Sequence, residues 1–116
     1  MVFNYGWEIN SKIKLFEKTF FISVVAESYF AEDKITKEQE CAFVQFKNDE
    51  QRLLNNVASE LMKFARSADV RFTPRELVFK RNGECALLFD DTNNQDEGIA
   101  VLLDTEIRIL SQDEYL

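Results

Sequence analysis

The chain has 116 residues, 46% of them hydrophobic, and it contains eleven Phe, three Gly and one Pro. This length and composition predict one folded domain, residues 1–116, with a sizeable core and no low-complexity segment. The net charge is −7 and histidine is absent, which excludes Ser–His and Cys–His nucleophile pairs and disfavours binding to nucleic acid.

The first thirty residues predict strands. Residues 7–9 and 12–15 alternate weakly between apolar and polar side chains, and residues 19–26 are β-branched and aromatic without helical periodicity. We expect Glu17 and Lys18 to form the tight connection between the second and third of these strands.

The middle of the chain predicts two helices. Thr36 and Gln39 have the spacing of a capping box. In this motif the threonine oxygen accepts a hydrogen bond from the backbone N–H of Gln39, and the Gln39 side chain reaches back to the backbone N–H of Thr36. Asn48-Asp49 is a second start signal, and the apolar stripe behind it predicts a helix over residues 50–67 with a solvated opposite face. Thr73-Pro74 ends the helical region, because proline disfavours helix at the preceding residue.

Residues 77–81 and 84–89 are β-runs that flank Asn82-Gly83. This pattern predicts a two-residue hairpin with a type I′ turn, and therefore a positive φ at both Asn82 and Gly83. A polar loop over residues 90–97, a strand over 98–103, a turn at Asp104-Thr105 and a strand over 106–110 complete the chain.

The element order predicts an α+β fold with a mostly antiparallel sheet and two central helices packed on one face. If residues 20, 22 and 24 face the helices, then residues 21 and 25 face away; likewise residues 77, 79, 87, 89, 101 and 103 share one face, and residues 78, 86, 88, 100 and 102 share the other. The strands thus leave apolar side chains on both faces of the sheet, whereas one wet face should give a cleaner alternation. We expect the N-terminal segment, sheet curvature or a second subunit to cover the second face. A homodimer is therefore one alternative. We also expect residues 112–116 to dock through Tyr115 and Leu116.

Cys41 and Cys85 each fall within an apolar-patterned element, which favours two buried free thiols over a disulfide. Two cysteines are too few for a cysteine-based zinc site. The chain has no apolar run of secretory-signal length and nothing close to the roughly 20 apolar residues of a membrane span. We therefore expect a cytoplasmic protein, with reduced thiols and no membrane partner.

Negative charge is concentrated in the last third of the chain. Residues 1–83 carry a balance of +1, whereas residues 84–116 carry nine acids against Arg108 alone, a balance of −8. Such a surface attracts basic proteins or cations and repels nucleic acid. The candidate partner-binding residues are Asp90, Asp91, Asp96, Glu97, Asp104, Glu106, Asp113 and Glu114.

The 90–97 segment also supports a competing hypothesis, a carboxylate- or metal-dependent enzyme. Four oxygen-bearing residues in it have the alternate spacing of EF-hand ligands, but Gln95 stands where Gly is needed and Val101 where a bidentate Glu is needed. The pattern is therefore not an EF-hand. We predict no catalytic residue, no metal site and no cofactor.

Residues 15–18, 35–39, 89–90, 97–101 and 112–116, together with the element order, resemble a family of small bacterial domains of unknown function. Family members often have a histidine between the residues matching Glu97 and Gly98, and aromatic residues in the preceding loop; this chain lacks both. Some relatives resemble immunity proteins of bacterial toxin systems. The resemblance therefore implies an immunity-like protein, and it carries over no catalytic residues.

Together these features predict a small binding protein that presents its acidic last third to a basic partner. The enzyme centred on residues 90–97 and a structural homodimer subunit are the alternatives.

Overall fold

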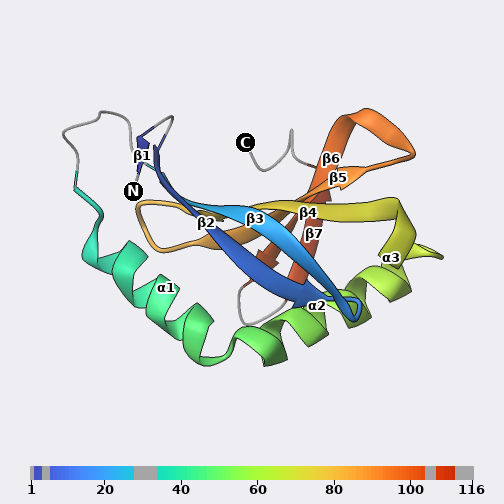
Figure 1. Ribbon diagram of the computed structural model, residues 1–116, viewed down its shortest axis with the longest axis horizontal. Coiled ribbons are helices and arrows are strands. Elements are labelled where there is room, and N and C mark those ends of the chain that lie inside the picture. Colours follow the sequence, from blue (N-terminus) through green and yellow to red (C-terminus); the bar gives the residue numbers. More distant parts are fainter. Residues whose placement is uncertain (1, 4–5, 28–33, 104–106, 112–116) are drawn as a thin grey trace.

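Figure 1 shows the computed structural model, which describes residues 2–3, 6–27, 34–103 and 107–111. Within these ranges the chain forms seven strands and three helices. In chain order they are β1 (Val2–Phe3), β2 (Gly6–Leu15), β3 (Lys18–Glu27), α1 (Lys37–Asn48), α2 (Glu50–Phe64), α3 (Ala68–Arg71), β4 (Phe72–Phe79), β5 (Cys85–Asp91), β6 (Asn94–Leu103) and β7 (Ile107–Ser111). The predicted docking of residues 112–116 lies outside the described residues.

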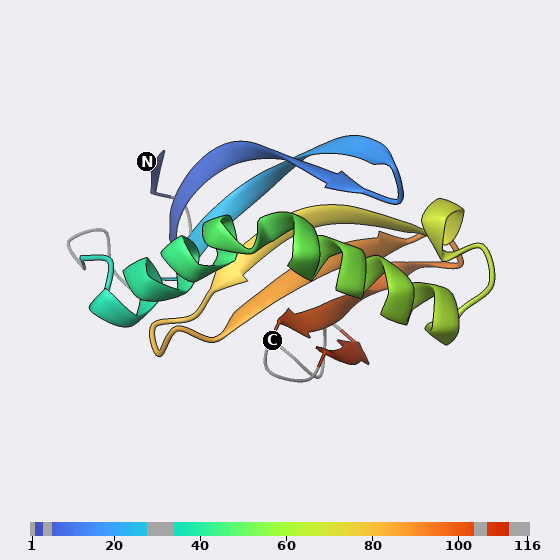
Figure 2. The same cartoon turned by 90° about the horizontal axis from the view of Figure 1, so that it is seen from below.

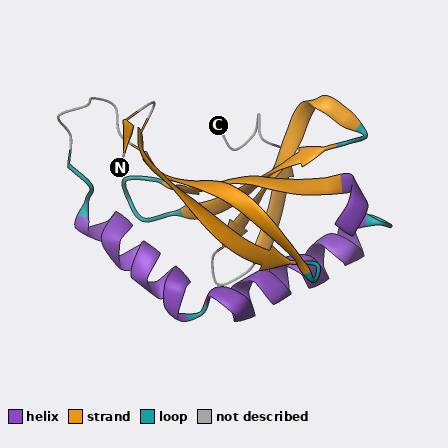
Figure 3. Cartoon of the chain, viewed as in Figure 1, coloured by secondary structure: helices purple, strands orange, loops and turns teal. Residues whose placement is uncertain are grey.

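The strands form one sheet in the spatial order β1-β2-β3-β4-β5-β6-β7. Neighbours are antiparallel except β3 and β4, which run parallel. A parallel pair needs a crossover connection, and α1 and α2 supply it by crossing one face of the sheet (Figures 2 and 3). The predicted α+β fold, with a mostly antiparallel sheet and two central helices on one face, is confirmed. The short helix α3 is additional.

The main core lies between the helices and the sheet. Alternate strand residues face the helices, as the sequence pattern predicted for residues 22, 24, 77, 79, 87, 89 and 101. From α2, Leu54, Val57 and Leu61 pack against them and are at most 1% exposed. Their spacing of three and four residues places them on one side of the helix, which explains why this helix forms against the sheet.

The second face of the sheet is apolar and buried within the single chain. Its cluster consists of Val25, Val78, Ala86, Leu88, Ala100 and Leu102, none more than 3% exposed. Among the described residues, Leu110 of β7 packs against it. The division of side chains between the two faces agrees with the sequence pattern. Since one chain already buries this face, the face itself gives no reason to expect a second subunit.

The N-terminal hairpin is longer than predicted. The two expected short strands are one ten-residue strand, β2, which pairs with β3 over its whole length. The connection is Phe16-Glu17 rather than Glu17-Lys18, and both residues have positive φ, 52° and 62°. Neither residue is a type that favours this conformation, so no local residue pattern marks a turn at this position.

The end of the helical region also differs from the prediction. Helix α2 ends at Phe64 rather than near residue 67, and β4 begins at Phe72, five residues before the predicted strand. Pro74 therefore lies inside a strand. The register shifts between Pro74 and Glu76, and a bulge is one of the few places where a strand tolerates a residue without an N–H donor.

The predicted capping box of α1 is confirmed. The Thr36 hydroxyl accepts a hydrogen bond from the Gln39 N–H at 3.1 Å, and Gln39 Oε1 accepts one from the Thr36 N–H at 2.9 Å. The Gln39 side chain is buried, and its Nε2 donates to the carbonyl oxygens of Glu27 (2.9 Å) and Phe79 (3.0 Å). One side chain thus joins the start of α1 to the last residues of the parallel strands β3 and β4.

The predicted type I′ turn is wrong, although the hairpin exists. Lys80 O accepts a hydrogen bond from the Gly83 N–H, and the Lys80 N–H donates to Glu84 O, each at 2.8 Å. The loop is therefore three residues long. Gly83 has a φ of 91°, whereas Asn82 is absent from the positive-φ residues among those described. This is a type I turn closed by a glycine bulge, and the Asn82 Oδ1 accepts from the Glu84 N–H at 2.9 Å.

Replacing Gly83 by Val should lower the free energy of unfolding by about 2 kcal/mol, because a β-branched residue is disfavoured at positive φ. A Cβ atom here would also lie 3.0 Å from the Glu38 carbonyl oxygen on α1. Urea unfolding checks the loss. Gly83→Asn separates the two causes, since Asn tolerates positive φ but keeps the Cβ contact, and it should cost less. An unchanged midpoint for Gly83→Val would contradict the turn assignment.

Candidate functional site

The eight predicted partner-binding residues divide into three groups in the structure. Asp90 and Asp91 end β5. Asp96 and Glu97 lie in the first half of β6, which the structure describes by its backbone. Asp104, Glu106, Asp113 and Glu114 lie outside the described residues.

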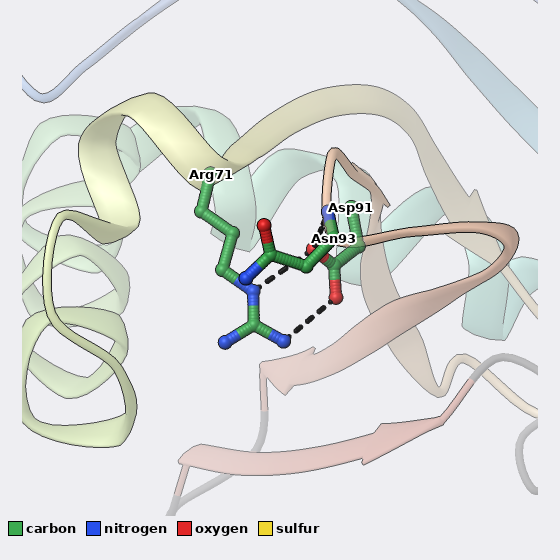
Figure 4. A network of polar contacts seen from close by, with 3 residues as sticks. All are labelled: Arg71, Asp91 and Asn93. Carbon is green, nitrogen blue, oxygen red and sulfur yellow. Dashed lines mark hydrogen bonds and ion pairs between the residues drawn. The ribbon is translucent and has the colours of Figure 1, made fainter.

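Asp91 forms the strongest ion pair of the described part of the chain (Figure 4). Arg71, the last residue of α3, donates from Nε to Oδ1 and from Nη2 to Oδ2, each at 2.9 Å. The Asn93 N–H donates to the same carboxylate at 2.9 Å, and the Thr92 N–H donates to the Arg71 carbonyl at 3.0 Å. Two parallel N–H···O⁻ bonds fix the direction of the pair as well as its distance.

This pair leaves little of the Asp91 carboxylate accessible to a partner, which the sequence analysis did not foresee. Its side chain is only 5% exposed. The Arg71 hydrogen bonds lower the pKa of the Asp91 carboxyl below its ordinary value, partial burial opposes that shift, and the Asn93 N–H adds to it. A carboxylate with a lowered pKa is also a poor general acid near neutral pH.

Bases of β4 and the following turn engage two more acids of the last third. Arg75 Nε lies 3.2 Å from Asp90 Oδ1, and Lys80 Nζ lies 3.9 Å from Glu84 Oε2. The Asp90 side chain is 65% exposed, so it remains accessible. The positive charge of the middle of the chain thus offsets the first acids of the last third.

The predicted polar loop over residues 90–97 is mostly strand. The connection between β5 and β6 is Thr92-Asn93, since Asp91 pairs with Asn94. The next pair is Phe89 with Ile99, so residues 95–98 bulge opposite Asp90. A hollow of about 340 Å³ lies beside this bulge, lined by Asp90, Asp91, Thr92 and Gly98.

Asp90 and Asp91 are the acids of the 90–97 segment whose side chains the structure describes. Within the described residues, no group of three or more His, Cys, Asp or Glu side chains is placed to hold a metal ion. The two carboxylates nearest the hollow are engaged by guanidinium groups.

The two cysteines differ in environment. Both are free thiols, but Cys41 is exposed on α1 and Cys85 is buried at the start of β5. The prediction of burial is correct for Cys85 and wrong for Cys41. Burial raises the pKa of the Cys85 thiol far above its ordinary value, so this thiol stays protonated at neutral pH and is unsuited to act as a nucleophile.

One concave surface of the described part of the chain was not foreseen from the sequence. It is a cleft of about 560 Å³ between α1, α2, the β4–β5 turn and the end of β6. Its lining includes buried Phe46 and Cys85 and the charged residues Asp49, Arg52 and Glu84. Ligand sites commonly combine an apolar floor with a few polar groups in this way. The residues come from four elements, so no local sequence signal could have identified them.

Comparison with known proteins gives no relative for this chain. No protein-family profile, no curated protein sequence and no solved structure matches it. None of the helices that the structure describes is both long enough and apolar enough to cross a membrane.

Replacing Asp91 by Asn should lower the free energy of unfolding at pH 7 by about 1–2 kcal/mol, because the charge-assisted bonds to Arg71 are lost. The folded-state pKa of Asp91 is lowered, so its stabilisation is complete above the unfolded-state pKa of about 3.9 and disappears as pH falls through the folded-state value. The difference between wild type and variant should therefore shrink in acid.

Urea unfolding at pH 7 and at progressively lower pH measures this difference. Asp90→Asn is the matched control, because the Asp90–Arg75 pair is exposed and such pairs contribute little. Equal losses for Asp90→Asn and Asp91→Asn, or a loss for Asp91→Asn that persists in acid, would contradict the assigned role of the Arg71 pair.

Proposed function

We propose that this domain is a non-catalytic binding protein whose acidic C-terminal third engages a basic partner protein. The observation that carries the proposal is the distribution of charge after internal pairing. Glu84, Asp90 and Asp91 have basic partners from α3, β4 and the following turn. Residues 92–116 still hold six acids against Arg108 alone, a balance of −5.

The position of these acids along the chain supports one shared surface. Asp96 and Glu97 belong to β6, Asp104 and Glu106 belong to the segment that joins β6 to β7, and residues 113 and 114 follow β7. Since β7 is the last strand in the sheet order, β6 and β7 form one edge of the sheet, and in the sequence the six acids lie within or next to these two strands. A field of one sign speeds encounter with an oppositely charged protein and weakens as salt is added.

The chemistry of the described residues favours binding over catalysis. The buried Cys85 thiol stays protonated because its pKa is raised, and the Asp91 carboxylate forms an ion pair with Arg71. Neither group has the pKa shift toward neutrality that a general acid or base requires. An immunity protein that neutralises a basic toxin nuclease is one case of such a function, in line with the family resemblance. We also propose a cytoplasmic location, which the free Cys41 and Cys85 thiols support.

The proposal predicts that neutralising acids of the last third abolishes salt-sensitive capture of a partner. The variant carries Asp104→Asn, Glu106→Gln and Asp113→Asn. Immobilised wild-type protein should retain a basic protein from a lysate of the source cells at low salt and release it at high salt, whereas the variant should retain little at either. Mass spectrometry identifies the retained protein and gives its net charge.

The matched control neutralises three exposed acids elsewhere, through Glu17→Gln, Glu38→Gln and Glu40→Gln, and it should capture as the wild type does. Equal loss in both triple variants would show that only net charge matters. Retention of an acidic protein, or capture that does not respond to salt, would contradict the proposal.

A further inference from the structure

We propose that the cleft between the helices and the β4–β5 turn is the anchor pocket for an arginine side chain of the basic partner. The inference rests on the proposed function and names the contact through which the partner is held. It follows from the shape of the cleft, the chemistry of its lining and its position beside the acidic third of the chain.

The floor of the cleft is apolar and comes from four elements. Phe46 of α1, Leu53 of α2, Cys85 of β5 and Leu103 of β6 line it. Phe46 and Cys85 are buried, whereas Leu53 and Leu103 are partly exposed. The thiol of Cys85 adds no charge, because its pKa is raised. The methylene stem of a long side chain would therefore lie against apolar atoms, as arginine and lysine stems do when they bury along apolar surfaces.

The rim of the cleft is charged, with an excess of acid. Asp49 lies between α1 and α2, and Glu84 follows the β4–β5 turn, with its Oε2 3.9 Å from Lys80 Nζ. An incoming guanidinium would therefore share Glu84 with Lys80. Arg52 is the only basic residue among those that line the cleft in the described part of the chain. Gln45 and Asn82 add neutral polar groups. This rim suits a cationic head group with several N–H donors, and it disfavours a phosphate or other anion.

Part of the cleft lining belongs to the acidic third of the sequence. Leu103 lines the cleft and is the last residue of β6, and Asp104 and Glu106 follow it in the sequence. Glu84 belongs to the same third. A partner attracted by this charge would meet the cleft beside the residues that attract it, so one surface would supply both the long-range attraction and the anchor.

Arginine is the side chain that fits both parts of the cleft. Its stem is apolar, and its guanidinium presents five donors in a planar arrangement that matches carboxylates. Arginine is also enriched among the few interface residues that dominate binding energy, which occupy desolvated pockets near the centre of an interface. A volume of about 560 Å³ is in the range of ligand sites and admits the side chain together with neighbouring groups of the partner.

Arg52 competes with the incoming guanidinium. Its Nη2 lies 3.1 Å from Asp49 Oδ2, and its side chain is 64% exposed. An exposed pair of this kind contributes little to stability. Removing Arg52 would free Asp49 and lower the repulsion of a second cation. The proposal therefore predicts a variant with increased affinity, a result that damage to the fold cannot mimic.

The probe is N-acetyl-arginine N-methylamide, titrated into ¹⁵N-labelled protein and followed by two-dimensional NMR. We expect saturable shifts that concentrate on the amides of Gln45, Gly83, Cys85 and Leu103, with a Kd of about 1 mM for a ligand of this size. The citrulline analogue has nearly the same shape without the charge, and it should bind much more weakly. Arg52→Gln should tighten arginine binding by about two- to fivefold.

Asp49→Asn combined with Glu84→Gln should weaken binding by about fivefold or more. Glu60→Gln is the matched control, because Glu60 lies on α2 outside the cleft and pairs with Lys63. Shifts scattered over the acidic surface, equal binding of citrulline, or no gain from Arg52→Gln would each overturn the anchor pocket. Binding of an anionic or uncharged small molecule at the same amides in preference to arginine would also overturn it.

The failure of this inference is distinguishable from failure of the proposed function. If the partner is captured in a salt-sensitive way but the arginine probe leaves the cleft amides unshifted, the anchor is wrong and the acidic surface stands. If the probe binds as expected but no basic partner is captured, the cleft assignment stands and the partner class is wrong.

Discussion

The buried Gln39 side chain satisfies backbone groups at the place where the parallel strands β3 and β4 end. Its Nε2 binds the carbonyl oxygens of Glu27 and Phe79, and its Oε1 caps the first turn of α1. The Thr36 hydroxyl extends the junction by donating to the Arg81 carbonyl at 2.8 Å. An unpaired buried carbonyl is costly, so these bonds hold α1 in one position over the sheet. That position sets one wall of the cleft and brings the β4–β5 turn against α1.

A second junction at the opposite end of the crossover distributes the charge. Arg71 ends α3 and holds Asp91 at the β5–β6 turn, where the Thr92 N–H also binds the Arg71 carbonyl. Three bases of the middle of the chain thus pair with the first three acids of the last third: Arg71 with Asp91, Arg75 with Asp90, and Lys80 with Glu84. From residue 96 onward the chain contains six more acids and a single base, Arg108. In the function that we propose, the later acids of this segment attract the partner, whereas Asp91 and Asp90 pair within the chain.

Features that depend on neighbours in the sequence were predictable. The Thr36–Gln39 capping box, the apolar stripe of α2 and the assignment of strand residues to two faces all follow from local spacing. Features that depend on distant partners were not. Nothing near Gln39 indicates that its amide reaches Phe79, 40 residues away, and nothing near Asp91 indicates Arg71. The predicted site treated its acids as one exposed patch because burial and pairing arise only after folding. The cleft was missed for the same reason.

Equilibrium urea unfolding of Gln39→Leu measures how much this side chain contributes to holding α1 against the ends of β3 and β4. Leucine has a similar size but cannot donate to the two strand-end carbonyls or return the capping bond. Because these hydrogen bonds are lost, we expect the free energy of unfolding to fall by about 2–4 kcal/mol. The same change at exposed Gln45, also on α1, should alter stability by no more than about 0.5 kcal/mol. A loss for Gln39→Leu as small as that for Gln45→Leu would contradict the account, because the strand ends and α1 would then be held together without this side chain.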